Sequence, residues 1–140
     1  MYNYLLINMI ESLEKYYNEL KDDLQLDQMN ISAKSLMIPG IKHKWVKRLI
    51  DAKIELKHQE SLMELTIKDL SEQKSNESPI NLSPMSIRKS VENSDIYKKL
   101  NEKVDEQKIL IEYFEKIERV VNSLTYDIKN IIEIIKSETI

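Results

Sequence analysis

The sequence predicts an all-α fold, and three observations support this prediction. The 140-residue chain contains one glycine and three prolines, which leaves few positions for tight β-turns. Lys, Glu, Leu and Ile, which favour helices or pack between them, dominate the composition. Apolar residues recur every three or four positions over long stretches, which is the period of one helical face. We therefore expect an elongated helical hairpin of coiled-coil character and no second globular domain.

The first expected helix covers residues 4–24. Its apolar residues follow the spacing that keeps one face against a partner, and they are Leu6, Ile10, Leu13, Tyr17, Leu20 and Leu24. The period is lost between residues 27 and 38. The pair Pro39-Gly40 then predicts a break, because proline lacks a backbone donor and glycine permits left-handed torsions. We expect a loop or a short helical turn here.

The second expected helix covers residues 41–71. Its apolar seam consists of Trp45, Leu49, Ala52, Leu56, Met63 and Leu70. Gln59 and Thr66 interrupt this seam with polar side chains. Serine, asparagine and proline then dominate, and their side chains compete with helical hydrogen bonds. Residues 73–94 are therefore expected to form an exposed linker.

The strongest helical pattern belongs to residues 95–137. Alternating spacings of four and three continue for more than three heptads through Leu110, Phe114, Ile117, Val121, Leu124, Ile128, Ile131 and Ile135. A second apolar set, which includes Tyr113, Val120 and Ile134, widens this seam and indicates more than one neighbouring helix. Because the chain offers only two other helices, we expect self-association to cover the face, and we assign the eight seam residues to oligomerisation.

These elements suggest that different segments of the chain have different functions. Residues 1–72 would carry the binding surface, residues 73–94 would be the linker, and residues 95–140 would assemble the oligomer. The terminal helices of several copies would then bundle around a common axis to form a homo-oligomeric ring.

Several classes of function are disfavoured. The chain has no cysteine, which excludes disulfides and thiolate metal sites, and a single glycine leaves no phosphate-binding loop. His43 and His58 lie in no recognisable catalytic or metal motif. No stretch approaches the roughly 20 apolar residues of a membrane span, and the first residues do not resemble a signal peptide. We expect a cytoplasmic protein that is not an enzyme, with no cofactor, no metal and no membrane partner.

The net charge is −3, but positive charge is concentrated in one segment. Residues 34–57 hold seven Lys or Arg side chains and two acidic ones, a net charge of +5. Cations beside an aromatic residue can attract phosphates and stack bases, as in single-strand binding. The candidate DNA-binding residues are Lys42, Lys44, Trp45, Lys47, Arg48, Lys53 and Lys57. Two other interpretations stay open: Trp45 occupies a seam position and can be a core residue, and the lysines can be a solvated face.

Several collinear segments resemble the UvsY recombination mediator proteins of tailed phages. They are Leu13-Glu14 through Asp27, Lys34-Ser35-Leu36-Met37-Ile38-Pro39 leading into Lys44-Trp45, and Ser123-Leu124-Thr125-Tyr126-Asp127-Ile128-Lys129. The resemblance covers most of the chain from about Leu13 to Ile135, with the linker unmatched. It implies a helical ring, assembled through the terminal helix, that binds single-stranded DNA. It also implies that the protein helps load a RecA-like recombinase onto strands covered by single-strand-binding protein, in DNA recombination, repair and replication.

One departure from the family pattern concerns the DNA contact. The family has a Lys-x-Arg pair late in the second helix, and here Lys68 matches the lysine while Leu70 replaces the arginine. The resemblance therefore adds Lys68 to the candidate DNA-binding residues, while the cations between Lys42 and Lys57 are expected to contribute more. If the protein is phage-encoded, it would act in the host-cell cytoplasm. The alternative is a structural coiled-coil adaptor that binds only proteins, for which an acidic chain with ordinary heptads suffices.

Overall fold

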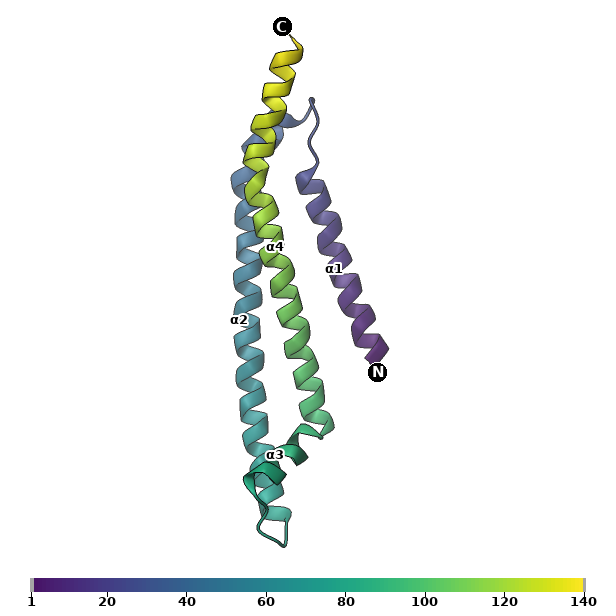
Figure 1. Cartoon of the computed structure of the whole chain (residues 1–140), viewed down its shortest axis with the longest axis vertical. Helices are drawn as coiled ribbons and strands as arrows, with labels where there is room; N and C mark the ends of the chain where they lie inside the picture. The colour runs from purple at the N-terminus through teal and green to yellow at the C-terminus, as the bar shows by residue number, and fades with distance from the viewer. Residues whose placement is uncertain (1, 140) are drawn as a thin grey trace. The chain divides into compact units, whose positions relative to one another are not determined.

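Four helices make up the structure, a computed structural model that describes residues 2–139 and the side chains of residues 6–139. They are α1 (Tyr2–Leu24), α2 (Ile31–Glu77), α3 (Pro84–Glu92) and α4 (Asp95–Glu138), drawn in Figure 1. No strand occurs among the described residues. The all-α fold is thus confirmed, and α1 and α4 agree closely with the expected helices over residues 4–24 and 95–137. Met1 and Ile140, at the ends of the expected ranges, lie outside the described residues.

The expected break at Pro39-Gly40 is wrong, because α2 begins at Ile31 and continues through both residues. Pro39 removes one helical donor, but Gly40 keeps a negative φ and the helix is not interrupted. Ile38 and Ile41 are buried on either side of the pair, at 8% and 5% exposure. Their burial offsets the missing hydrogen bond. The helix start is fixed by a turn in which Asp27 Oδ1 accepts hydrogen bonds from the Met29 and Asn30 amides.

The segment expected to be a linker contains more helix than its composition predicts. Helix α2 continues to Glu77, and α3 begins at Pro84. Ser83 caps α3, since its Oγ accepts a hydrogen bond from the Ser86 amide at 3.2 Å. Proline is tolerated in the first helical turn because its missing N–H would have no helical partner there. Within the expected linker, residues 73–94, non-helical backbone is therefore confined to residues 78–83 and 93–94. The functional division of the chain at residues 72 and 94 stays a prediction.

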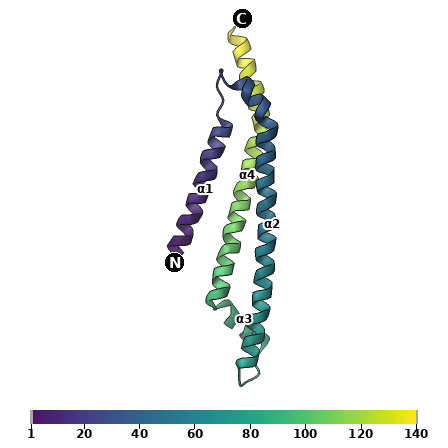
Figure 2. The same ribbon diagram turned by 180° about the vertical axis from the view of Figure 1, so that it is seen from behind.

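The chain forms two compact units: unit 1 comprises Met1–Ile50 and Leu110–Ile140, and unit 2 comprises Asp51–Ile109. In unit 1, α1 lies beside the first part of α2 and the last part of α4, as Figures 1 and 2 both show. Helices α2 and α4 run antiparallel here. Trp45 meets Phe114, whereas Ile38, earlier in α2, clusters with Leu124 and Ile128, later in α4.

The core of unit 1 contains most of the residues that we assigned to oligomerisation. Phe114, Ile117, Val121, Leu124 and Ile128 are each at most 4% exposed, buried against the chain's own helices. Leu110, Ile131 and Ile135 are half-buried. The chain itself therefore covers most of this seam. The role of the eight residues in assembly stays a prediction.

Unit 2 pairs the second part of α2 with α3 and the first part of α4. Ala52, Val91 and Val104 are buried, but polar side chains enter the helix pair. Gln107 Nε2 donates a hydrogen bond to the Ala52 carbonyl at 2.9 Å, while the buried Oε1 of Gln59 has no hydrogen-bond partner. Burial raises the pKa of Glu106 above its usual range, and the nearby charge of Glu102 raises it further. This pairing is more polar than the core of unit 1.

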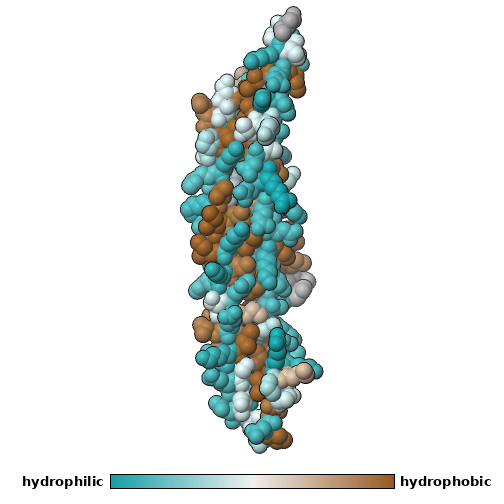
Figure 3. Space-filling view, turned by 60° about the vertical axis from the view of Figure 1, so that its left-hand side comes forward, coloured by the Kyte–Doolittle hydropathy of each residue, from teal (hydrophilic) through white to brown (hydrophobic). Residues whose placement is uncertain are grey.

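Large apolar side chains remain exposed on each of the three long helices. Figure 3 shows one face of the molecule, on which hydrophobic atoms lie among hydrophilic ones. The exposed side chains include Leu6, Ile10 and Tyr17 of α1, Leu36, Ile54 and Leu65 of α2, and Val120, Tyr126, Ile132 and Ile134 of α4. Such faces are available for further contacts.

Candidate nucleic-acid interface

Trp45 lies at the centre of unit 1 and is only 1% exposed. Its ring centroid lies 6.2 Å from that of Phe114 in α4 and 6.3 Å from that of Tyr16 in α1. Tyr16 and Phe114 also meet edge to face, at 5.0 Å. Trp45 Nε1 donates a hydrogen bond to Asp23 Oδ2 at 2.8 Å, which satisfies the indole donor. The interpretation of Trp45 as a core residue is therefore confirmed, and in this structure its ring is closed to bases.

Two of the candidate DNA-binding cations form ion pairs with α1. Lys44 Nζ lies 2.6 Å from Asp23 Oδ2 and 3.1 Å from Glu19 Oε1. The Arg48 guanidinium binds Glu19 through both terminal nitrogens, at 2.6 and 2.9 Å. This bidentate geometry is the strongest that arginine forms with a carboxylate. We call these residues, Glu19 and Asp23 of α1 with Lys44, Trp45 and Arg48 of α2, the α1–α2 clamp.

The clamp combines charge with aromatic contacts. The Arg48 guanidinium carbon lies 4.7 Å from the Trp45 ring centroid, and Lys44 Nζ lies 5.2 Å from it. These are cation–π distances. Hydrogen bonds from Arg48 and then Lys44 lower the pKa of the Glu19 carboxyl below its usual range, although partial burial opposes them. Glu19 is therefore ionised at neutral pH.

The remaining candidate cations are positioned differently. Lys42 is half-buried, and its Nζ donates a hydrogen bond to Thr125 Oγ1 of α4 at 3.3 Å. Lys47 of unit 1 and Lys53, Lys57 and Lys68 of unit 2 are exposed. The structure thus brings Lys44, Trp45 and Arg48 together with Glu19 and Asp23 of α1, and the side chains of Lys47, Lys53, Lys57 and Lys68 are exposed. Glu19 and Asp23 were not predicted as site residues, because their contacts with Lys44, Trp45 and Arg48 form only when α1 packs on α2.

The exposed lysines of unit 2 share one side of α2. Lys57 and Lys68 are separated by eleven residues, about three helical turns, so they point in nearly the same direction. Lys53 lies one turn before Lys57. Exposed Ile54 and Leu65 border this side, and Glu64 reduces its positive charge. We call Lys53, Lys57 and Lys68 the outer lysines of α2.

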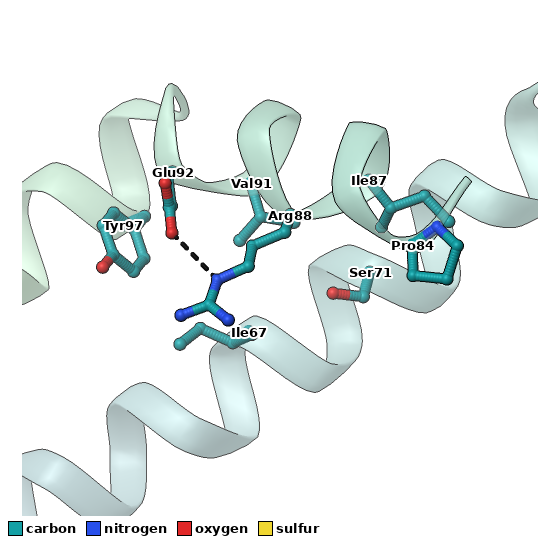
Figure 4. Close-up of a pocket in the computed structure, with 8 residues that line it drawn as sticks. All are labelled: Ile67, Ser71, Pro84, Ile87, Arg88, Val91, Glu92 and Tyr97. Carbon is teal, nitrogen blue, oxygen red and sulfur yellow. Dashed lines mark hydrogen bonds and ion pairs between the residues drawn. The ribbon is translucent and has the colours of Figure 1, made fainter. Parts of the chain in front are cut away.

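A cavity of about 430 Å³ lies in unit 2 between α2, α3 and α4, and Figure 4 shows its lining. The lining residues are Ile67, Ser71, Pro84, Ile87, Arg88, Val91, Glu92 and Tyr97. In Figure 4 the Arg88 side chain extends over Ile67, and its Nε donates a hydrogen bond to Glu92 Oε1 at 3.1 Å. The lining contains no histidine that could act as a base beside Ser71.

Residues 2–139 contain no group of three or more His, Cys, Asp or Glu side chains able to hold a metal ion. Over the same residues no helix is long and apolar enough to cross a membrane. His43 and His58 are both exposed.

The fold and the site define an all-α protein in which cations of one long helix form ion pairs with carboxylates of the preceding helix. The particular family is identified by comparison with known proteins. Residues 19–139 match the family described as "Recombination, repair and ssDNA binding protein UvsY", and the chain belongs to this family. The resemblance found in the sequence is thus confirmed. A role in recombination and single-stranded DNA binding follows from this membership. The family description names no chemical reaction.

Solved structures agree with this assignment at the level of the fold. The chain is similar to the bacteriophage T4 recombination mediator protein UvsY in lattice type IV, with a TM-score of 0.77 and 17% sequence identity over 90% of this chain and 98% of that one. Lattice type II of the same protein gives a TM-score of 0.75 and 17% identity, covering 91% and 97% of the two chains. Lattice type I of that protein gives a TM-score of 0.73 and 16% identity, covering 87% of this chain and 97% of the other. No curated protein matches the chain.

Proposed function

We propose that this protein is a recombination mediator, which binds single-stranded DNA and helps load a RecA-like recombinase onto strands covered by single-strand-binding protein. The observation that carries the proposal is the family match over residues 19–139. The T4 protein with the similar fold is itself named a recombination mediator. If the protein is phage-encoded, the proposal places it in the host-cell cytoplasm, where it acts on DNA.

The outer lysines of α2 are the proposed first contacts for DNA. Lys53, Lys57 and Lys68 are exposed on one helix, and lysines bind phosphates as point charges. Lys47, also exposed, lies on the same helix in unit 1. Each neutralised phosphate releases counterions, so affinity falls steeply as the salt concentration rises. A single chain offers few such contacts.

A homo-oligomeric ring would supply many contacts at once. Linked binding sites raise the overall affinity because later contacts form at high effective concentration. A flexible strand that follows such a ring would be bent and partly freed from single-strand-binding protein. We propose that recombinase nucleates on this prepared strand.

Assembly of the ring is proposed to use the C-terminal part of α4. Val120, Ile132 and Ile134 are 43%, 37% and 57% exposed on the outside of their own chain. Their burial between copies would be favourable by about 25 cal/mol per Å² of apolar area. The eight seam residues would then support assembly indirectly, because they hold α4 in place.

DNA binding is tested by fluorescence anisotropy of a labelled single-stranded oligonucleotide at several salt concentrations. Lys57→Ala/Lys68→Ala is expected to weaken binding about tenfold and to reduce the salt slope by roughly 0.7 for each lost phosphate contact. The matched control is Lys129→Ala/Lys136→Ala, which removes two exposed lysines of α4. Equal losses in both variants would contradict the assignment to α2. No binding by the unaltered protein at low salt would favour the protein-binding adaptor.

Recombinase loading requires a separate assay. Filament formation by a RecA-like recombinase is followed on single-stranded DNA that is already covered by single-strand-binding protein. The protein is expected to shorten the lag before filament growth. On naked DNA it should have little effect, because no covering protein has to be displaced. An unchanged lag on covered DNA, despite normal DNA binding, would contradict the mediator role.

A further inference from the structure

The α1–α2 clamp combines cations with an aromatic ring, as single-strand-binding sites do. Its cations, however, already contact carboxylates of the same chain. Arg48 holds the Glu19 carboxylate in a bidentate contact, and Lys44 binds Glu19 and Asp23. Arginine forks bind carboxylates and phosphates in the same geometry. Beside these cations lies Trp45, the only tryptophan of the chain, and aromatic rings of this kind stack on DNA bases. Phosphates that bound Lys44 and Arg48 would therefore have to replace these two carboxylates.

Helix α1 is held less firmly than its partners. None of its described side chains is buried, whereas the buried side chains of unit 1 belong to α2 and α4. Leu6, Ile10 and Tyr17 of α1 are 47–58% exposed. The clamp side chains Glu19, Lys44 and Arg48 keep about a third of their surface exposed, so solvent and salt screen their ion pairs.

Release of α1 would open one side of Trp45 and leave the other side packed. Tyr16 contacts the indole from α1, and Phe114 contacts it from α4. The antiparallel packing of α2 on α4 includes the cluster of Ile38 with Leu124 and Ile128, to which no clamp residue belongs, although Leu24 at the end of α1 and Leu26 in the next loop also pack against it. The non-helical residues 25–30 join α1 to α2. The part of α1 that carries the clamp would then move from α2 while Leu24 and Leu26 hold its end and α2 stays paired with α4.

We propose that Glu19 and Asp23 are an intramolecular substitute for DNA phosphates, and that single-stranded DNA displaces α1 from Lys44 and Arg48 and opens Trp45 for base stacking. This inference rests on the proposed function, and it adds a mechanism by which α1 regulates the binding of single-stranded DNA. The outer lysines of α2 make the first contact, and the clamp provides a second, closed site. Opening occurs only when phosphates are concentrated nearby, because they must compete with carboxylates of the same chain.

The first test removes the carboxylate charges without changing the shape of the side chains. Glu19→Gln/Asp23→Asn is expected to bind a labelled single-stranded oligonucleotide about tenfold more tightly. Its salt slope should steepen by roughly 0.7 for each of the two cations set free. Glu11→Gln/Glu14→Gln is the matched control, because it removes two exposed charges of the same helix. Adding Lys44→Ala/Arg48→Ala to Glu19→Gln/Asp23→Asn should abolish the gain. The same small change in both charge variants would overturn the proposal.

The second test uses the unaltered protein and the fluorescence of Trp45. Oligonucleotide anisotropy first establishes saturation at low salt, and tryptophan emission and its quenching by acrylamide are then measured with and without DNA. Opening of the clamp should quench the emission through base stacking in the complex. Acrylamide should then reach Trp45 more readily in Glu19→Gln/Asp23→Asn without DNA than in the unaltered protein. Saturated binding with unchanged Trp45 emission would overturn the displacement of α1 and leave the proposed function intact. No binding by either protein would contradict the proposed function itself, and the inference with it.

Discussion

The indole of Trp45 combines an apolar ring with one N–H donor, and unit 1 satisfies both. Phe114 and Tyr16 surround the ring, and Asp23 accepts the hydrogen bond. The position of Trp45 in the helical seam indicated a core residue as one of two interpretations, beside a DNA-binding one, and the structure shows the ring buried. The acceptor could not be predicted, because Asp23 comes from another helix. A side chain this well enclosed contributes mainly to the stability of the fold.

Trp45→Ala is therefore expected to lower the free energy of unfolding by about 3–5 kcal/mol, through lost burial and the cavity that remains. Urea unfolding followed by circular dichroism measures the loss. Tyr126→Ala is the control, because Tyr126 is 71% exposed and its removal should change stability by at most about 0.5 kcal/mol. A loss below about 1 kcal/mol for Trp45→Ala would show that the indole is not a core residue in solution.

Glu19 should make stability depend on pH. The hydrogen bonds from Arg48 and Lys44 lower its pKa in the folded state below the ordinary value of 4.5. The ionised Glu19 therefore adds to the free energy of unfolding when the pH is above that ordinary pKa. This stabilisation is lost as the pH falls through the folded-state pKa. Because the side chain is a third exposed, the contribution should be about 1 kcal/mol or less.

The measurement compares urea midpoints of Glu19→Gln and the unaltered protein near neutral pH and below about pH 4. The variant should be less stable at neutral pH, and the difference should vanish in acid. Glu14→Gln, an exposed change on the same helix, should show no such pattern. A difference that persists unchanged in acid would mean that the carboxylate charge is not responsible.

At the scale of the element, α2 shows how packing overrides local signals. Pro39 and Gly40 both disfavour helix, yet the helix continues because Ile38 and Ile41 are anchored in the core. Gly40 has a helical backbone, and a Cβ added there would have no atom within 4 Å. Neither the backbone conformation at Gly40 nor the space around it therefore requires glycine.

Gly40→Ala is expected to raise the free energy of unfolding by about 0.5–1 kcal/mol, because alanine restricts the unfolded chain and fits the helix without strain. The urea midpoint should rise with an unchanged dependence on denaturant concentration. The contrasting change is Ala52→Gly in the same helix, at a buried position, which should destabilise the protein. A destabilised Gly40→Ala variant would indicate that the helix bends at this residue in solution.

Helix α1 shows that charge also influences how a helix docks. Its heptad stripe predicted that Leu6, Ile10 and Tyr17 would face a partner, but these side chains are about half exposed. The helix instead contacts α2 through Tyr16, Glu19 and Asp23, which lie beside that stripe. The other stripe residues, Leu13, Leu20 and Leu24, are half-buried, so the apolar stripe and the ion pairs together determine how α1 docks.

At the scale of the whole molecule, the apolar residues of α4 fall into a buried group and an exposed group. The seam residue Ile128 is 4% exposed within its own chain, whereas Ile134 is 57% exposed. Ile128→Asp would bury an unpaired charge, which costs several kcal/mol, and should reduce helix content as well as assembly. Ile134→Asp should leave the fold intact and yield smaller oligomers.

Light scattering gives the mass of each variant, and circular dichroism gives its helix content. Tyr126→Asp, an exposed change of the same kind, tests whether any added charge on α4 disrupts assembly. If Ile134→Asp retains the mass of the unaltered protein, copies do not associate through this side of α4. If Ile128→Asp retains full helix content, the burial of the seam within one chain is not required for folding.

The sequence by itself determined the all-α class, the positions of α1 and α4 and the family, because composition and helical periodicity are local properties of the chain. Only the tertiary structure decided the neighbours of the α4 seam and the carboxylate partners of Lys44 and Arg48. It also decided the continuity of α2 through Pro39-Gly40. These features depend on contacts between residues far apart in the chain, whose energies local patterns do not contain. A lysine in the sequence is a free cation or half of an ion pair according to which helix packs beside it.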